Sequence, residues 1–248
     1  MNAPKYLESW GAGDLYESYM GRWSRKLAQQ FITWIDVPTG ANWLDVGCGT
    51  GALVETILNQ CDPQTVVGMD RSPGFVAHAQ NSIEDQRVRL EVGDVVSLPF
   101  ETDRYDSSIS GLVLNFVSDP AAMVSEMARV TNTTGVVAVY VWDYAGGNEM
   151  MRHFWDAATQ LDSGSSKLDQ RERFPLCQPE PLRELFVQSG LGGVEIRSIE
   201  IDTPFRDFDD YWIQFSRRAG RCSNLRDVSR RTRPQQTSRC HTRPPTDP

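Results

Sequence analysis

Apolar residues along the chain alternate between two periodicities. Short runs with strand spacing lie at 44–46, 65–70, 87–92, 105–110 and 136–142, and stretches with helical spacing separate them. A β-α-β-α-β succession of this kind requires right-handed crossovers and a largely parallel sheet. We therefore predict an α/β fold with a doubly wound, mostly parallel, Rossmann-like sheet and helices on both faces.

Local signals set several boundaries of these elements. Ser72 before Pro73, and Asp119 before Pro120, are typical of helix starts, because Ser and Asp cap free N–H groups and Pro suits the first turn. The near-continuous apolar run Val136–Trp142 predicts a central strand covered on both faces. Residues 162–167 are rich in Ser and Gly, which predicts a loop, and the imperfect alternation in 194–201 predicts an edge or antiparallel strand.

The two ends of the chain differ in character from its middle. Residues 23–35 have one apolar helical face, and residues 16–23 form an aromatic cluster that either packs on the sheet as a helical cap or closes over a ligand as a lid. Residues 217–248 have almost no apolar side chains, so we predict a disordered Arg/Pro-rich tail after a domain spanning 1–216. The tail is interpreted as inert, with a basic nucleic-acid-binding arm as the alternative.

The formal net charge of −8 hides an uneven distribution. Residues 217–248 contain nine Arg, no Lys and two Asp, which leaves −15 on residues 1–216. Since Lys and Arg supply most of the non-specific affinity for phosphates, this acidic body disfavours nucleic acid as a partner.

Composition also narrows the class of protein. The first ten residues carry no apolar core of a signal peptide and no run of 18 apolar residues occurs, so we expect a cytoplasmic protein without a membrane span. The five cysteines are odd in number and form no C-x-x-C pair, which argues against a disulfide framework and against a metal site.

The stretch from Asp45 to Gly51 joins the first strand to a helix through a glycine-rich turn. Gly47-x-Gly49-x-x-Ala52 satisfies the dinucleotide fingerprint, and Asp70 lies at about the distance along the chain where an acid meets a ribose. However, the Asp45 carboxylate would repel a pyrophosphate at close range. The turn therefore favours a cationic ligand without phosphate, and Asp94 after the third strand adds an acid suited to an adenine amino group.

The successive motifs WLDVGCGTG, GMDRS, GDVVSLPF, YDSSISGLVLNFVSDP and SEMARVTNTTGVVAVYVWD extend this interpretation. Over residues 10–216 they resemble class I S-adenosylmethionine-dependent methyltransferases of the small-molecule type, particularly the group similar to quinone-biosynthesis methylases. The resemblance implies that 47–49 line the methionine end of the cofactor, Asp45 serves its ammonium group, Asp70 takes the ribose hydroxyls, Asp94 takes the adenine amino group and the Val95 backbone takes the ring. The expected cofactor-binding residues are Asp45, Gly47, Cys48, Gly49, Asp70, Arg71, Asp94, Val95 and Asn115.

The resemblance further implies direct methyl transfer to an O, N or C atom of a small organic acceptor. No catalytic base is assigned, because the Asn115 amide positions but takes no proton, and His78 and His153 are lone histidines on helices. Leu114-Asn115-Phe116-Val117 lacks the Pro-Pro-aromatic motif of nucleic-acid amino-methyltransferases. Aromatic residues in 143–181 favour an apolar acceptor, and the expected substrate-binding residues are Tyr16, Arg22, Trp23, Trp142 and Phe154.

The resemblance breaks near the C-terminal end. Related folds finish with a strand that returns antiparallel beside the fifth, and no apolar run after Phe215 supplies it. We therefore expect that last strand to be absent. We interpret the residues after about Arg217 as translated in a shifted reading frame, or as otherwise replacing the sequence typical of the family. A cofactor-binding but inactive or regulatory protein, and more distantly an NAD(P)-linked oxidoreductase, stay open as alternatives. The pattern assigns no oligomeric state.

Overall fold

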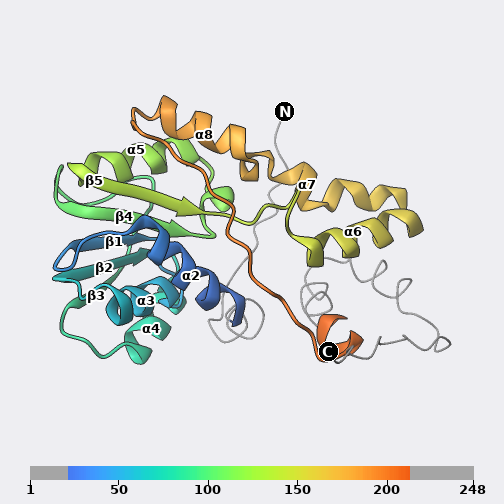
Figure 1. Ribbon diagram of the computed structural model, residues 1–248, viewed down its shortest axis with the longest axis horizontal. Helices are drawn as coiled ribbons and strands as arrows, with labels where there is room; N and C mark the ends of the chain where they lie inside the picture. The colour runs from blue at the N-terminus through green and yellow to red at the C-terminus, as the bar shows by residue number, and fades with distance from the viewer. Residues whose placement is uncertain (1–21, 213–248) are drawn as a thin grey trace, which may run out of the picture.

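The structure, a computed structural model, describes residues 22–212. Five strands form one parallel sheet in the order β3-β2-β1-β4-β5 (Figure 1). The strands are β1 (Asn42–Val46), β2 (Thr65–Asp70), β3 (Val88–Val92), β4 (Tyr105–Gly111) and β5 (Thr131–Tyr140). The predicted doubly wound α/β sheet is confirmed.

The strand order reverses between β1 and β4. Asp45 at the end of β1 is in register with Gly68 of β2 on one side and with Ile109 of β4 on the other. Because the strands are parallel, the carboxyl ends of β1, β2 and β4 meet at one edge of the sheet. In open α/β sheets this switch point is where ligands bind.

Helices cover both faces of the sheet (Figure 1). On one face lie α2 (Arg22–Ile35), α3 (Ala52–Gln60) and α4 (Pro73–Ser82), whose apolar residues share a core with Trp43 and Ile109. On the other face lie α5 (Pro120–Val130) and α8 (Pro179–Gln188). The helix over 23–35 was predicted with one apolar face, and that face is buried.

Two helix starts follow the predicted capping chemistry. The Ser72 hydroxyl accepts a hydrogen bond from the backbone N–H of Phe75 at 3.4 Å, before α4. The Asp119 carboxylate accepts one from Ala122 at 2.9 Å, before α5. Each cap satisfies a donor that the first helical turn leaves free.

The prediction of a central fifth strand is wrong. Among residues 22–212, β5 pairs only with β4 and forms the edge of the sheet, and most of its residues are half-buried. The strand also begins earlier than the apolar run, since Thr131 pairs with Tyr105 before the register shifts to Ser107 and Val136. The apolar run reflects helices packed on both faces, which hydrophobicity alone does not distinguish from a strand neighbour on each side.

Residues 194–201 are not a strand, contrary to the prediction. Their backbone is without regular structure, although Val194 packs against the core under α5 and α8 and Ile199 packs against the core under α2 and α3. Side chains that reach both cores place this segment beside the edge of the sheet. Among the described residues no strand lies between it and β5, so the segment has no ladder to join.

Beyond β5 the chain builds a cap outside the sheet (Figure 1). It contains α6 (Glu149–Leu161), η3 (Ser163–Leu168), α7 (Gln170–Arg173) and η4 (Pro175–Cys177). The start of α6 is capped by Asn148, whereas the stretch predicted as a loop at 162–167 is mostly the short 3₁₀ helix η3. The predicted disordered tail, the expected boundary at 216 and Tyr16 lie outside the described residues.

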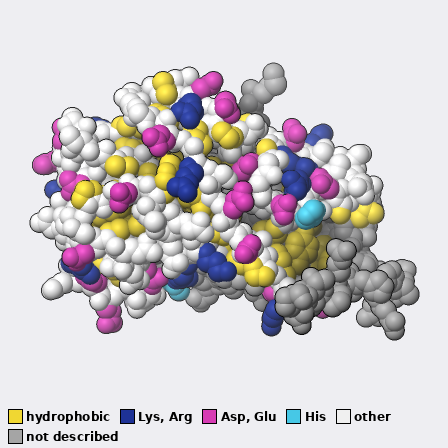
Figure 2. All heavy atoms as spheres, in the orientation of Figure 1, with side chains coloured by type: hydrophobic (Ala, Val, Ile, Leu, Met, Phe, Trp, Pro, Cys, Tyr) yellow, Lys and Arg dark blue, Asp and Glu magenta, His cyan; other side chains and the backbone are white. Residues whose placement is uncertain are grey.

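Within the part of the chain that the structure describes, no helix is long and apolar enough to cross a membrane. Figure 2 shows Asp and Glu side chains spread over the visible face, with Lys and Arg side chains interspersed singly or in small groups. This face therefore presents no continuous basic patch.

Candidate functional site

The glycine turn after β1 adopts a backbone that other residues rarely take. Gly47, Gly49 and Gly51 have φ angles of +82°, +54° and +93°. The N–H groups of Gly47 and Cys48 donate to the Met69 carbonyl at 2.7 and 3.0 Å, which fixes the turn against the end of β2. Three left-handed residues in five explain why the sequence places glycine at these positions.

The space around the glycines differs from one to the next. A Cβ on Gly47 would lie 2.6 Å from the Val113 side chain, and one on Gly51 would lie 2.6 Å from Ile83. A Cβ on Gly49 would meet nothing within 4 Å. Gly49 is thus the point where the turn faces open space.

Asp45 lies directly before this turn and is 1% exposed. Residues two apart in a strand face the same side, so Asp45 faces the same side of the sheet as Trp43, the side covered by α2, α3 and α4. Neither of its carboxyl oxygens has a hydrogen-bond partner among residues 22–212. Burial, and secondarily the nearby Asp70, raise the pKa of Asp45 to about 8.

Asp70 ends β2 and is tied to the turn. Its carboxylate accepts hydrogen bonds from the N–H groups of Gly49 at 3.0 Å and Ser72 at 2.8 Å. Burial raises the pKa of Asp70, and these two bonds and the exposed Arg71 oppose that shift. Asp70 therefore has partners that stabilise its charge, whereas Asp45 has none among the described residues.

The helix α3 begins at the same turn. Gly51 occupies its N-cap and makes no side-chain capping bond, so the N–H groups of Ala52, Leu53 and Val54 have no carbonyl partner within the helix. A helix N-terminus attracts negative charge. An anion-attracting helix end and a buried carboxyl group at one turn complement a ligand that carries a carboxylate and an ammonium group.

The Cys48 side chain does not enter this site. It packs beside β2, where a Cβ on Gly68 would lie 3.0 Å from the Cys48 Cβ. Burial, then the charges of Asp45 and Asp70, raise the pKa of the Cys48 thiol well above its usual value. A ligand at the turn would therefore contact the backbone of Cys48 and not its side chain.

The loop after β3 places Asp94 and Val95 differently from each other. Asp94 is exposed and its carboxylate accepts a hydrogen bond from the N–H of Val96 at 3.1 Å, whereas the Val95 side chain is buried in the core. The N–H of Gly93 donates to the Asp70 carbonyl at 3.0 Å. The structure thereby joins the second and third predicted acidic positions through the backbone.

Farther along, the same loop is held by Arg129 of α5. Its guanidinium donates to the carbonyls of Phe100 at 2.8 Å and Leu98 at 2.9 Å, and it binds both carboxyl oxygens of Glu126 at 2.7 Å. Glu126 in turn accepts from the N–H of Leu98 at 2.8 Å. Sequence periodicity does not predict this network, because Glu126 and Arg129 have the spacing of ordinary polar residues on a helix and their partners are loop carbonyls.

The end of β4 supplies Asn115. Leu112 has a φ of +61°, an unusual value for a bulky residue, and its N–H donates to the Tyr140 carbonyl at 2.9 Å. The chain then forms η2 (Leu114–Phe116). The amide nitrogen of Asn115 is buried without a hydrogen-bond partner among the described residues.

Aromatic side chains connect this strand end to the cap. The Phe116 and Phe174 rings lie 5.3 Å apart between centroids, and the Phe174 and Tyr144 rings 5.5 Å apart. Tyr144 and Phe174 belong to the aromatic residues of 143–181 that were expected to favour an apolar acceptor, whereas Phe116 was not predicted, although it directly follows Asn115. Its position after a strand end was the available signal.

The predicted substrate-binding residues fall into two groups. Trp23 and Trp142 pack together, with Phe205 beside Trp23 at 5.8 Å between ring centroids. Phe154 lies in the core of the cap with Trp155. The side chain of Arg22 lies outside the described residues, as does Tyr16, so their role in binding stays a prediction.

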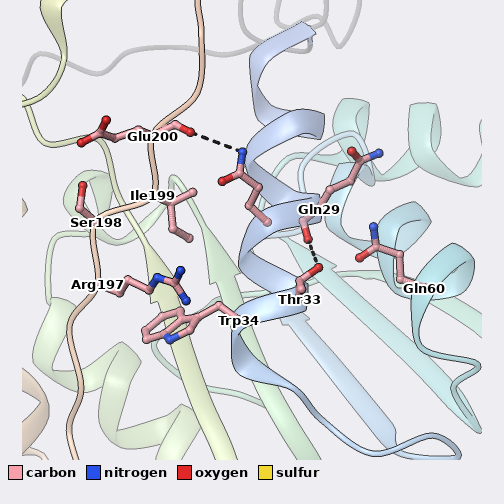
Figure 3. A pocket seen from close by; sticks show the side chains of 9 residues that line it. Gln29, Thr33, Trp34, Gln60, Arg197, Ser198, Ile199 and Glu200 are labelled. Carbon is pink, nitrogen blue, oxygen red and sulfur yellow. Dashed lines mark hydrogen bonds between the residues drawn. The ribbon is translucent and has the colours of Figure 1, made fainter.

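A separate groove of about 580 Å³ lies between α2 and residues 197–200 (Figure 3). It reaches Gln60 at the end of α3, and the Gln30 side chain donates to the Glu200 carbonyl at 3.4 Å. A nine-residue helix is about 13 Å long, so this groove is far from the glycine turn at the other end of α3. The groove is not part of the candidate site.

Within the part that the structure describes, no group of three or more His, Cys, Asp or Glu side chains is arranged to hold a metal ion. His153 is exposed on α6 and His78 is half-buried on α4. Neither histidine lies on the strand ends and loops that form the candidate site.

Comparison with known proteins agrees with this geometry. Residues 44–139, which run from β1 to β5, match the family described as a methyltransferase domain. This part of the chain is similar to methyltransferase domains. The glycine turn and the ends of β1, β2 and β4 all lie within the matched residues.

Two curated methyltransferases are similar to the chain. The malonyl-[acyl-carrier protein] O-methyltransferase of Acetivibrio thermocellus is 22% identical over 193 residues, which cover 75% of this chain and 65% of that protein. The demethylmenaquinone methyltransferase of Roseiflexus castenholzii is 32% identical over 101 residues, which cover 41% of this chain and 42% of that protein. The chain thus spans less than two thirds of the length of either relative.

Two solved structures share the fold of the methyltransferase domain. A chain of the complex between the Haloferax volcanii Trm112 methyltransferase activator and a methyltransferase has a TM-score of 0.60 at 23% identity, covering 82% of this chain and 85% of that chain. The [4+2]-cyclase SpnF has a TM-score of 0.52 at 23% identity, covering 67% and 56%. One of these two proteins is named a methyltransferase and the other a cyclase, so the shared fold alone does not define the reaction.

Proposed function

We propose that the chain binds S-adenosylmethionine at the carboxyl ends of β1, β2 and β4 and transfers its methyl group to a small organic acceptor. The observation that carries this proposal is Asp45, a buried carboxyl group without a partner among the described residues, beside a left-handed glycine turn. Once ionised, this carboxyl group repels a phosphate but forms an ion pair with an ammonium group. When bound, S-adenosylmethionine supplies a sulfonium-linked methyl group that an acceptor nucleophile displaces.

In this proposal each residue of the site binds a different part of the ligand. Asp45 receives the ammonium group, and the N-terminus of α3 receives the carboxylate of the same amino-acid end. Asp70 and the loop at Asp94 and Val95 take the ribose and the adenine. The open space over Gly49 is where the ligand passes close to the backbone.

The acceptor enters from the side of Asn115 in this proposal. Asn115 orients it through its buried amide, and the rings of Phe116, Phe174 and Tyr144 form an apolar wall. Orientation and exclusion of water are the main contributions asked of the protein in such a displacement. An apolar acceptor is supported by the name of one relative, a demethylmenaquinone methyltransferase.

Equilibrium binding and turnover test the proposal in two stages. Calorimetric titration is expected to show saturable binding of S-adenosylmethionine and S-adenosylhomocysteine and none of NAD. Labelled methyl groups are then expected to appear in phenols, quinols or amines of a defined panel. Binding of NAD without binding of the two sulfur ligands would overturn the assignment.

A second candidate is a cofactor-binding protein that transfers no methyl group. It is favoured by the fold shared with a protein named as a cyclase and by the position of both described histidines on helices, outside the strand ends and loops of the candidate site. Binding of both sulfur ligands without methyl transfer to any acceptor of the panel would select it. None of the four similar proteins described above is named an oxidoreductase, and that alternative is not retained.

A further inference from the structure

The charged surroundings of Asp45 are one-sided. The acidic groups near it are Asp70 at the end of β2 and the Cys48 thiol in the turn, and both interact electrostatically with it. On the β4 side Asp45 is in register with the apolar Ile109, and the flanking Ser110 donates its hydroxyl hydrogen to the Val46 carbonyl at 2.6 Å. Among the described residues, no Lys or Arg forms an ion pair with Asp45.

A carboxylate in this position has no direct partner that would stabilise its buried charge among residues 22–212. Neither a hydrogen-bond donor nor an ion-paired cation is present there, and a second carboxyl group stands beside it. Of the two neighbours, Asp70 holds its negative charge more easily because two backbone N–H groups donate to it. A proton shared by the pair therefore resides on Asp45.

We propose that the ligand-free protein holds a proton on Asp45 and that binding of the ligand's ammonium group expels this proton to solvent. The inference rests on the proposed function, because it assumes a ligand whose amino-acid end enters the glycine turn. The carboxyl O–H bond breaks, the proton passes to a buffer base, and the carboxylate pairs with the ammonium group; no other covalent bond changes. Binding of the zwitterionic end is thereby coupled to pH at a single carboxyl group.

Asp45 is about nine-tenths protonated at pH 7, given its pKa of about 8. Binding at pH 6 to 7 is then expected to release about one proton, and the dissociation constant is expected to fall about tenfold per pH unit. An α-amino group has a pKa of about 8 as well, so this dependence flattens near pH 8. Above that pH the ligand itself loses its proton.

Two probes with the same nucleoside separate the effect of the amino-acid end. S-adenosylhomocysteine carries the ammonium group without the sulfonium charge, and 5′-methylthioadenosine keeps the nucleoside and the thioether but lacks the whole amino-acid end. Calorimetric titrations in buffers of different ionisation enthalpy count the protons released. S-adenosylhomocysteine is expected to release close to one proton at pH 6.5, and 5′-methylthioadenosine none.

The matched variants are Asp45→Asn and Asp62→Asn. Asp45→Asn keeps the size of the buried side chain and is expected to abolish proton release and the pH dependence of binding between pH 6 and 7.5. Asp62→Asn removes an exposed carboxylate beyond α3, away from the candidate site, and is expected to leave the proton count unchanged. An infrared band of a protonated carboxyl group, present in the ligand-free protein and absent in Asp45→Asn, reports the same proton without any ligand.

The possible outcomes distinguish a failure of this inference from a failure of the proposed function. Binding of S-adenosylhomocysteine with no proton release between pH 6 and 7 overturns the inference and leaves the proposed function intact. A proton count that survives in Asp45→Asn also overturns it, because another group then carries the proton. Absence of binding by both sulfur ligands at every pH overturns the proposed function itself.

Discussion

The carboxylate of Asp70 accepts a hydrogen bond from the backbone N–H of Gly49 at 3.0 Å. This bond joins the end of β2 to the turn that follows β1, so two strand ends behave as one unit at the site. The second oxygen of Asp70 accepts from Ser72, the cap of α4, at 2.8 Å. One side chain thereby positions the turn, a strand end and a helix start.

Replacing Asp70 by Asn tests this junction. The amide has one acceptor oxygen in place of two, so one of the two backbone N–H groups loses its partner, and hydrogen bonds to charged groups contribute about 1.5–3 kcal/mol. We expect S-adenosylhomocysteine to bind about 10- to 100-fold more weakly, as measured by calorimetry. Asp62→Asn, at an exposed carboxylate beyond α3, serves as the control and is expected to leave the affinity unchanged.

Gly49→Ala tests the open space over the turn. A left-handed alanine costs about 1–2 kcal/mol in any context, and here its methyl group also fills the proposed path of the ligand. Gly40→Ala is a matched control, because Gly40 has a φ of +76° and equally open surroundings away from the site. We expect both variants to lose similar stability in urea unfolding and only Gly49→Ala to lose affinity; equal affinities would contradict the placement of the ligand.

The stability of the ligand-free protein is expected to fall as the pH rises from about 4 to about 8. The pKa of Asp45 is raised from 3.8 to about 8 by folding, so the folded state keeps a proton that the unfolded state gives up in this window. The contribution of this group is lost by at most about 1.4 kcal/mol per pH unit and is constant above pH 8. Urea unfolding across pH 4 to 9 measures it as the difference between the native protein and Asp45→Asn, and a flat difference would contradict the prediction.

Arg129→Lys tests the network that holds the loop after Asp94. An ammonium group cannot reproduce the planar fork that contacts Glu126 and the carbonyls of Leu98 and Phe100. We expect a loss of about 1–3 kcal/mol in the free energy of unfolding. Arg152→Lys makes the same change in an exposed pair with Glu149 at the same spacing, and we expect a loss below about 1 kcal/mol there.

The sequence was sufficient to predict most of the sheet and the location of the candidate site. Strand periodicity, the glycines and the Ser72 and Asp119 caps are local signals, and each depends on only a few neighbouring residues. The position of Asp45, a carboxyl group directly before a glycine turn, is also a local signal, and its role in binding stays a prediction.

What the sequence did not predict depends on contacts between distant segments. The edge position of β5 depends on which strands are present beside it. The apolar run at 136–142 would be the same in a strand at the centre of a sheet. Likewise, the irregular backbone of 194–201 depends on the lack of a neighbouring ladder, since its alternating side chains are those of a strand. The Arg129 network and the contact of Phe116 with Phe174 join residues about 30 to 60 positions apart.

The edge strand β5 has a consequence for how the protein behaves in solution. Along its outer side, backbone N–H and C=O groups find no ladder partner among residues 22–212, over a strand of ten residues. Such an edge is a template on which another extended chain can add a strand. The Tyr140 carbonyl at the end of this strand also accepts the hydrogen bond from Leu112, which leads to Asn115. A strand added at this edge would therefore change the position of a residue next to the candidate site.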